Sequence, residues 1–426
     1  MQTIRKVFIV GGKRIPFCRS HTKYMGLSNL ELITPALKSL VAEFKLEGQI
    51  LGEASFGAVS KHQADWGFAR ECVMESGLSP MTPAYDIQKA CATSLETIIS
   101  IGNKIALGQI ECGIAGGADT NSDVPLEFSK KFSDRLIRLQ AAKNWQQKLT
   151  ALKGFAPKEL MPKIPAIREK RTGLSMGESA EVMAKTWGIT RLEQDELAYE
   201  SHRKGTLAYE SGFFNDLITP CLDVQKDNLL RPDTTMDKLA KLKPSFDYTG
   251  KGTLTAGNSS SLTDGAAAVF LASEEYCLKH KLTPLAVLSF NASAAVNYTG
   301  GEGLLMAPPY ALAKLLRQSQ MNWQDFDFYE IHEAFAAQVL CNLKALNDEE
   351  FCRTKLNETK VFGEINREKL NINGGSLALG HPFAATGARI VGTLAKMISQ
   401  EKKPKKGVIS ICTAGGMGVT AILESV

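Results

Sequence analysis

The chain of 426 residues is too long for one ordinary core and predicts two or three domains. A hydrophobic content of 44% is average for a globular protein, and no apolar run approaches the ~20 residues that span a bilayer. The net charge of +5 is mild, and the nine cysteines include no CxxC pair, which argues against a disulfide framework and a zinc site.

The N-terminus carries no signature of a signal peptide. Met1 to Lys6 runs directly into the strand-like residues Val7 to Gly12. We therefore expect a cytoplasmic protein of the bacterial type.

Short β-branched runs alternate with helical stretches along the chain, which predicts an α/β fold. Lys6 to Val10 is expected to form a strand, and Glu31 to Lys45 a helix. Ser179 to Trp187 is predicted as another helix, and Val408 to Cys412 as a late strand.

One pattern occurs in both halves of the chain. Cys91-Ala92-Thr93-Ser94 starts a predicted helix, and a strand with Ala115-Gly116-Gly117 follows it. In the second half Pro382 to Gly387 starts a helix, and a strand with Ala414-Gly415-Gly416 follows. We interpret this recurrence as a duplicated α/β domain.

A basic segment from Asn121 to Gly177 interrupts the first half. Between Lys130 and Arg171 it has twelve Lys or Arg and three acidic residues, which suggests an anionic ligand, a membrane surface or an acidic partner. Apolar residues at helical spacing predict an amphipathic helix or a helical pair: Phe128, Phe132, Leu136, Leu139, Trp145, Leu149 and Leu152. We expect this stripe to pack onto the parent domain. Docking to a membrane or to a partner protein is the alternative.

Cys91 follows the strand-like residues Ala84 to Ile87 and begins a helix. A cysteine there faces unpaired N–H groups and the positive end of the helix dipole, so we expect its pKa to be lowered. A lowered pKa would make Cys91 a nucleophile. Taken alone, however, a cysteine in this position is more often a small buried helix residue.

Three further side chains are candidates for the same chemistry. His381 lies in a glycine-rich loop before a proline, where an imidazole can point into a cleft as a general base. Cys412 ends a strand before Thr413-Ala414-Gly415-Gly416, a loop whose N–H groups can form an oxyanion hole. His332 follows the apolar run Phe326 to Ile331, and it could hydrogen-bond a carbonyl oxygen or cap a helix.

Taken together, these residues resemble the thiolase family over nearly the whole chain. The likeness includes the Cys91 stretch, Gly257 to Ala266, His332-Glu333-Ala334-Phe335-Ala336, Gly380-His381-Pro382 and Cys412 to Gly418. It is greatest to the thiolase (β) subunits of fatty-acid oxidation complexes, which have His where most thiolases have Asn before Glu-Ala-Phe.

The resemblance implies a thiolase fold, with two duplicated βαβαβαββ-type domains in a five-layer α-β-α-β-α arrangement and an inserted helical loop domain. Residues 1–120 and 178–273 would form the N-terminal domain, 121–177 the insertion, and 274–426 the C-terminal domain.

The resemblance also implies an acyltransferase that cleaves 3-ketoacyl-CoA with free coenzyme A. Cys91 would become acylated, His381 would take its proton, and Cys412 would protonate the departing acetyl-CoA carbanion. His332 and His381 would stabilise the enolate oxygen. The N–H groups of Cys91 and of Ala414, in the loop with Gly415, would stabilise the tetrahedral intermediate.

Three residues match family positions near the pantetheine: Ser260, Phe335 and Met176. Coenzyme A and acyl-CoA are substrates, so neither a cofactor nor a metal is expected. Two departures affect the detail. Ala414 stands where the family commonly has Gly, and Ser175 stands where many short-chain thiolases have His, which weakens acetoacetyl-CoA as the preferred substrate.

Alternatives remain open at this point. They are an acetoacetyl-CoA thiolase run towards condensation, a β-ketoacyl-carrier-protein synthase, and a non-catalytic acyl-CoA-binding scaffold. Cys412 argues against the synthase. A nucleic-acid site ranks last, because no recognised binding motif accompanies the basic residues. The resemblance further predicts a homodimer or a dimer of dimers, association with a hydratase/3-hydroxyacyl-CoA dehydrogenase chain, and membrane or partner contact through residues 121–177.

Overall fold

A computed structural model describes residues 4–163 and 168–426. The described strands form one ten-stranded sheet in the order β4-β3-β5-β6-β1-β7-β10-β9-β8, with β2 paired to β6. The strands are β1 (Val7–Arg14), β2 (Cys18–Arg19), β3 (Glu53–Phe56), β4 (Ala84–Asp86), β5 (Cys112–Asp119), β6 (Thr263–Ser273), β7 (Ala286–Ala295), β8 (Phe328–Ile331), β9 (Lys406–Thr413) and β10 (Met417–Glu424).

The two halves of the sheet repeat one topology. In the first half β4, β3 and β5 are parallel, while β6 runs antiparallel to both β5 and β1. In the second half β8 and β9 are parallel, and β10 runs antiparallel to both β9 and β7. The first half has the further edge strand β4 beside β3. In the second half a parallel bridge between Tyr329 of β8 and Leu370 takes the corresponding position. The halves meet where β1 pairs with β7, so the predicted duplication is confirmed.

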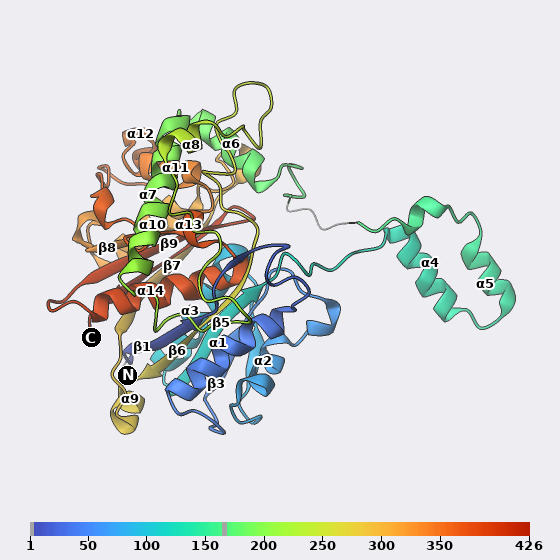
Figure 1. The fold of residues 1–426 in the computed structure, drawn as a ribbon, viewed down its shortest axis with the longest axis horizontal. Helices are drawn as coiled ribbons and strands as arrows, with labels where there is room; N and C mark the ends of the chain where they lie inside the picture. The colour runs from blue at the N-terminus through green and yellow to red at the C-terminus, as the bar shows by residue number, and fades with distance from the viewer. Residues whose placement is uncertain (1–3, 164–167) are drawn as a thin grey trace.

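Helices divide the molecule into five layers (Figure 1). Helices α1 (Asn29–Glu43) and α2 (Phe68–Ser76) cover the outer face of the first half. Helices α10 (Ala307–Ser319) and α11 (Ala336–Leu346) cover the outer face of the second half.

The central layer is the pair α3 (Thr93–Ala106) and α14 (Thr386–Ser399), which contacts both halves of the sheet. Nearly every residue of α14 is buried, including the polar residues Arg389, Thr393 and Lys396, because the helix packs between the two halves of the sheet. The five-layer α-β-α-β-α prediction is therefore confirmed.

The two Ala-Gly-Gly motifs are not equivalent. Gly116 and Gly117 lie inside β5, where an added Cβ would meet Ala267 O at 2.3 Å and Ala384 O at 2.6 Å. Gly415 and Gly416 instead form the turn after β9, with φ of +77° and +72°. The repeated glycines therefore meet different backbone requirements, close packing in one case and a left-handed turn in the other. The duplication was correctly inferred, but these motifs do not occupy matching positions in it.

Two longer helices, α6 (Met176–Thr186) and α7 (Arg191–Glu210), follow the inserted segment. Both begin with a capping box, at Ser175 and Thr190 respectively. The remaining short helices are α8 (Met236–Ala240), α9 (Glu274–His280), α12 (Glu349–Thr354) and α13 (Ser376–Leu379).

The inserted segment forms the predicted helical pair, α4 (Lys130–Ala141) and α5 (Trp145–Leu152). Figure 1 shows this pair set apart from the body of the molecule. Trp145 is 68% exposed and Leu149 58%, so the prediction that the stripe packs onto the parent domain is wrong. The few aromatic contacts are internal to the insertion, such as Phe128 with Phe132. An amphipathic pattern identifies an apolar face but not the surface that covers it.

None of the helices in the described part of the chain is long and apolar enough to cross a bilayer.

Candidate active site

Cys91 lies between β4 and α3, in the 3₁₀ turn Ala90–Ala92. The preceding residue, Ala90, has a left-handed φ of +45°, an unfavourable conformation for a residue with a Cβ. Thr93 holds this bend, because its Oγ1 accepts from Lys89 N at 2.8 Å and donates to Ala90 O at 2.7 Å. The bend presents Cys91, which is 8% exposed, at the start of the central helix α3.

Burial raises the pKa of the Cys91 thiol to about 12, although hydrogen bonds from the N–H groups of Ala414 and Cys91 lower it. The prediction of a lowered pKa is therefore wrong for this state of the site. The helix start supplies the expected N–H donors, but desolvation has the larger effect. In the free enzyme Cys91 is therefore a neutral thiol, and a base must take its proton before its sulfur can act as a nucleophile.

His381 follows Gly380, whose φ of +101° turns the chain back towards the sheet. Its backbone N donates to Thr263 Oγ1 at 3.1 Å, and its ring Nδ1 lies 2.7 Å from Thr386 Oγ1 at the start of α14. Burial, together with the charge of Arg389, lowers the pKa of His381 to about 3. The imidazole is therefore neutral and able to accept a proton.

His332 directly follows β8 and is 1% exposed. Its Nδ1 lies 2.9 Å from Ser376 Oγ, and its ring centroid lies 4.1 Å from that of His381. Burial lowers the pKa of His332 well below its usual value, and the neighbouring His381 and Arg389 lower it further, because each disfavours a positive charge on His332. Within the described residues, Nε2 of neither histidine has a hydrogen-bond partner.

The structure brings all four predicted catalytic side chains together. One ligand atom each of Cys91, His332 and His381 lies within 4.8 Å of the others. Cys412 ends β9 and is 1% exposed; burial, and then the neighbouring Cys91, raises its pKa well above the usual value. A nucleophilic thiol, two neutral imidazoles and a second buried thiol can attack a carbonyl carbon and exchange protons with what it releases.

A thiolate and two imidazoles are also donors of the kind that zinc prefers. Among the residues that the structure describes, Cys91, His332 and His381 form the group that could hold such an ion. The same groups have the geometry of acyl-transfer chemistry, and the absence of a metal stays a prediction.

The two backbone donors proposed after Cys412 differ in what they contact. The Ala414 N–H points to Cys91 Sγ, as an oxyanion hole beside the acylated sulfur requires. The Gly415 N–H instead donates to Glu169 Oε1 at 2.7 Å. The structure thus leaves Ala414, and not Gly415, directed at the nucleophile.

Comparison with known proteins agrees with this geometry. Residues 7–275 match the family model described as "Thiolase, N-terminal domain", and residues 282–425 match "Thiolase, C-terminal domain". The chain belongs to the thiolase family. It is 39% identical over 425 residues to a 3-ketoacyl-CoA thiolase of Pectobacterium carotovorum, covering 98% of this chain and 96% of the relative. A 3-ketoacyl-CoA thiolase of Shewanella amazonensis is 38% identical over 427 residues, with 98% and 97% covered.

Solved structures show the same thiolase fold. The acetyl-CoA acetyltransferase of Bacillus anthracis superposes with a TM-score of 0.82, at 29% identity and 100% coverage of both chains. A human mitochondrial 3-ketoacyl-CoA thiolase superposes with a TM-score of 0.82, at 27% identity and 99% coverage of both chains. This thiolase is accordingly an acyltransferase of that family.

The three predicted CoA-binding residues of this thiolase lie near one another. Phe335 and Met176 belong to the same apolar cluster as Cys412. Ser260 bonds through both its N and its Oγ to Ala334 O, at 3.0 and 2.8 Å, which places it against the His332 motif. Their contact with CoA stays a prediction.

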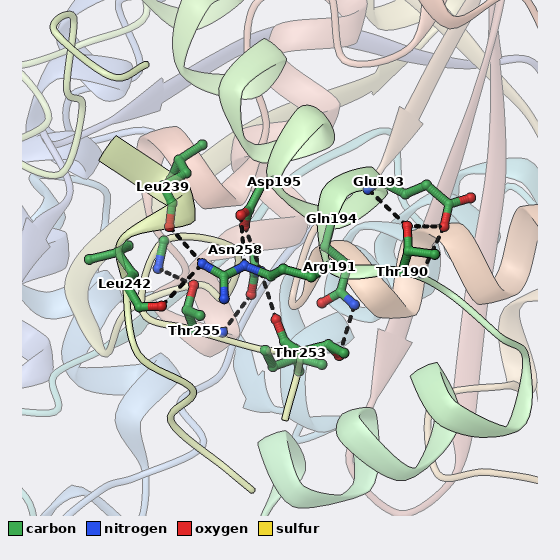
Figure 2. A network of polar contacts seen from close by, with 12 residues as sticks. Thr190, Arg191, Glu193, Gln194, Asp195, Leu239, Leu242, Thr253, Thr255 and Asn258 are labelled. Atoms are coloured by element: carbon green, nitrogen blue, oxygen red, sulfur yellow. Dashed lines mark hydrogen bonds and ion pairs between the residues drawn. The ribbon is translucent and has the colours of Figure 1, made fainter. Parts of the chain in front are cut away.

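A buried polar network fixes the loop that carries Ser260 (Figure 2). Asn258 Nδ2 donates to Asp195 Oδ1 at 2.9 Å, and Arg191 Nε donates to Asp195 Oδ2 at 2.6 Å. The carbonyl of Asn258 in turn accepts from Ala336 N at 3.0 Å. Helix α7 thereby holds the predicted CoA loop in register with the segment that follows His332.

Sequence reasoning missed several residues of this thiolase's site. Phe246 packs edge-on against Phe335, with 5.9 Å between ring centroids. Asp119 accepts from Ala384 N at 2.6 Å and so ties the end of β5 to the turn before α14. Asp119 had a signal, as a carboxylate in a buried strand, whereas Phe246 lies in an irregular loop that offers no periodicity.

Proposed function

We propose that this thiolase cleaves 3-ketoacyl-CoA with coenzyme A, giving acetyl-CoA and a shortened acyl-CoA. The observation that carries the proposal is Cys91, set beside two neutral imidazoles and a second buried thiol, Cys412. The relatives named 3-ketoacyl-CoA thiolase support the same substrate class.

In the first step Cys91 Sγ attacks the 3-keto carbon, and its proton passes to His381 Nε2. The alkoxide that forms is stabilised by the N–H groups of Cys91 and Ala414. As it collapses, the bond between the keto carbon and the α-carbon breaks. The electron pair moves into the thioester as an enolate, His332 and His381 stabilise its oxygen, and Cys412 protonates the α-carbon to release acetyl-CoA.

In the second step the Cys412 thiolate takes the proton of the CoA thiol. The CoA sulfur attacks the acyl carbon, and the bond between that carbon and Cys91 Sγ breaks. His381 returns its proton to Cys91. Every acid and base regains its starting state, so no further reactant is required.

The test is thiolysis measured across 3-ketoacyl-CoAs of increasing chain length. CoA-dependent cleavage that disappears in Cys91→Ser supports the proposal. Cleavage restricted to acetoacetyl-CoA, with efficient condensation of acetyl-CoA, would favour the condensing alternative. Decarboxylation of a malonyl thioester without CoA-dependent cleavage would replace thiolysis with a synthase reaction, and unchanged turnover in Cys91→Ser would contradict the role of Cys91.

We further propose that the enzyme works in fatty-acid β-oxidation as a homodimer, joined by a hydratase/3-hydroxyacyl-CoA dehydrogenase chain. The edge strand β4 leaves one side open to a second copy. The exposed Trp145 and Leu149, on a strongly basic insertion, supply an apolar and cationic face for a partner or a membrane. A cytoplasmic location stays a prediction.

Mass measurement of the purified protein tests the dimer. Binding of the dehydrogenase chain is then compared in wild type and in Trp145→Asp/Leu149→Asp, together with sedimentation on anionic vesicles. Loss of dehydrogenase binding in the variant supports the partner surface. Loss of vesicle binding alone assigns the face to a membrane, and a lone wild-type dimer that binds neither contradicts the proposal.

A further inference from the structure

Behind His332 lies a buried cation that the proposed reaction does not use. Arg389 of α14 is 3% exposed, and its Nη2 donates to Ser376 Oγ at 2.9 Å. Ser376 Oγ also lies 2.9 Å from His332 Nδ1. These three residues form a chain that ends on the ring of a predicted catalytic histidine.

We propose that Arg389, acting through Ser376, holds His332 in the tautomer that carries its hydrogen on Nε2. A guanidinium group only donates, so Ser376 Oγ is the acceptor in its bond with Arg389. The hydroxyl hydrogen of Ser376 is then free to donate to His332 Nδ1. An Nδ1 that accepts this bond has no hydrogen, and a neutral ring must carry its hydrogen on Nε2.

The opposite tautomer has a definite cost. If His332 Nδ1 carried the hydrogen, Ser376 Oγ would accept two bonds and its own hydrogen would need another acceptor. Ser376 is 0% exposed, and Oγ has no further hydrogen-bond partner within the described ranges 4–163 and 168–426. A buried donor without an acceptor costs about 1–3 kcal/mol, enough to favour the Nε2–H form strongly.

The catalytic consequence rests on the proposed thiolysis. His332 Nε2 is buried and has no protein partner among the described residues. With a hydrogen there, it donates to the thioester oxygen as negative charge develops on it. In the opposite tautomer a lone pair would face that oxygen and repel it.

His381 has the complementary requirement. Its Nδ1 lies 2.7 Å from Thr386 Oγ1, and no cationic side chain of the described residues is hydrogen-bonded to that hydroxyl. Thr386 Oγ1 can either donate to Nδ1 or accept from Nδ1–H, so this contact does not fix the tautomer of His381. The adjacent histidines therefore differ in partner, because only the hydroxyl beside His332 is held as a donor by a guanidinium group.

Glu330 completes the arrangement without touching the reacting atoms. It precedes His332 by two residues in β8, and so shares a face with it at the strand end. Burial lowers the pKa of Arg389, and Glu330 opposes this effect when its carboxyl group is ionised. Arg389 and Ser376 are thus positioning residues for His332.

The tautomer can be measured without substrate, by NMR of the enzyme labelled with ¹⁵N in its histidines. The chain has six histidines, and the His332 signals are those lost in His332→Asn. Wild type is expected to show the Nε2–H form for His332. Ser376→Ala should give a mixture, and Ser376→Thr, which keeps the hydroxyl, should restore the wild-type pattern. Ser410→Ala is the matched control, because Ser410 is a buried serine in β9 whose Oγ has no partner among the described residues.

An Nδ1–H form or an imidazolium for His332 in wild type would overturn the inference, and so would an unchanged pattern in Ser376→Ala. Arg389→Met tests the origin of the effect and should also produce mixed tautomers. In thiolysis assays Ser376→Ala should lower kcat about tenfold or more, with little change in KM for CoA. An inactive wild-type enzyme would refute the proposed function but would leave the NMR assignment of the His332 tautomer unaffected. Failure of the proposed function and failure of this inference can therefore be distinguished.

Discussion

Glu169 Oε1 accepts a hydrogen bond from the Gly415 N–H, with 2.7 Å between the two atoms. Glu169 belongs to the inserted segment, and Gly415 to the loop that follows Cys412. Tyr298 Oη donates to the other carboxylate oxygen at 3.2 Å. The insertion that projects from the body is therefore attached at its C-terminal end to the loop that presents the Ala414 N–H to Cys91 Sγ.

Loss of this attachment should slow acyl transfer. We expect Glu169→Ala to lower kcat about three- to tenfold, because the loop loses one charge-assisted hydrogen bond of about 1.5–3 kcal/mol but keeps its strand anchors. Thiolysis kinetics measure the effect. Asp134→Ala is the control, since Asp134 is an acid of the same insertion whose only ion pair among the described residues is with Lys130 on α4. Equal effects in the two variants would point to a general disturbance of the insertion.

The pH dependence of alkylation should reveal the resting state of Cys91. Burial raises its pKa to about 12, so the thiolate fraction grows about tenfold for each pH unit through the neutral range. The rate of inactivation by iodoacetamide is expected to rise from about pH 6 to pH 9 without a plateau. Peptide mass analysis identifies the alkylated residue, with Cys91→Ser as the control. A plateau below neutral pH would instead demonstrate a preformed thiolate–imidazolium pair.

That experiment bears on what the sequence could predict. Local motifs identified all four predicted catalytic residues, Cys91, His332, His381 and Cys412. Each lies at a strand end or in a tight loop, where a short contiguous stretch of sequence has a recognisable pattern. The pKa of Cys91 was predicted in the wrong direction. A helix start is visible in the sequence, whereas the burial that outweighs it depends on the complete five-layer packing.

Positioning residues were harder to recognise for a related reason. Ser376 lies 44 residues from His332 in the chain, and Glu169 lies 246 from Gly415. No periodicity links such pairs, and only the folded chain brings them together. The five layers themselves followed from the resemblance, and the duplicated domain from the repeated helix–strand order. The insertion's helices were predicted from their apolar spacing, while their separation from the body was not.

The central layer gives a matched pair of glycine substitutions on α14. A Cβ on Gly387 would meet Leu95 N of α3 at 2.4 Å, whereas a Cβ on Gly392 would approach Gly12 Cα only to 3.7 Å. We expect Gly387→Ala to destabilise the fold by about 1–3 kcal/mol or more, since the clash is with backbone. Gly392→Ala should be neutral or stabilise by up to about 1 kcal/mol, through helix propensity. Thermal unfolding of both variants measures the difference, and equal melting temperatures would contradict the close approach of α3 and α14.

Glu330 should make the stability of the fold depend on pH. Burial raises its pKa to about 8 from the usual value of 4.5, despite the opposing charge of Arg389 and with Glu333 adding to the rise. Since the folded pKa lies above the unfolded one, the stability from the neutral acid is fully present below about pH 4.5 and is lost as the pH rises to about 8. Glu330→Gln keeps the neutral shape and has no proton to lose.

The free energy of unfolding of Glu330→Gln should therefore increase relative to that of wild type as the pH rises. Between about pH 5 and pH 8 the free energy of unfolding of Glu330→Gln is expected to increase, relative to wild type, by roughly 3 kcal/mol. Melting temperatures of both proteins across this range provide the measurement. Glu424→Gln is the control, because Glu424 lies on the same sheet in a partly exposed ion pair with Lys406. A constant difference between Glu330→Gln and wild type would show that Glu330 is ionised throughout, with Arg389 holding its charge inside the fold.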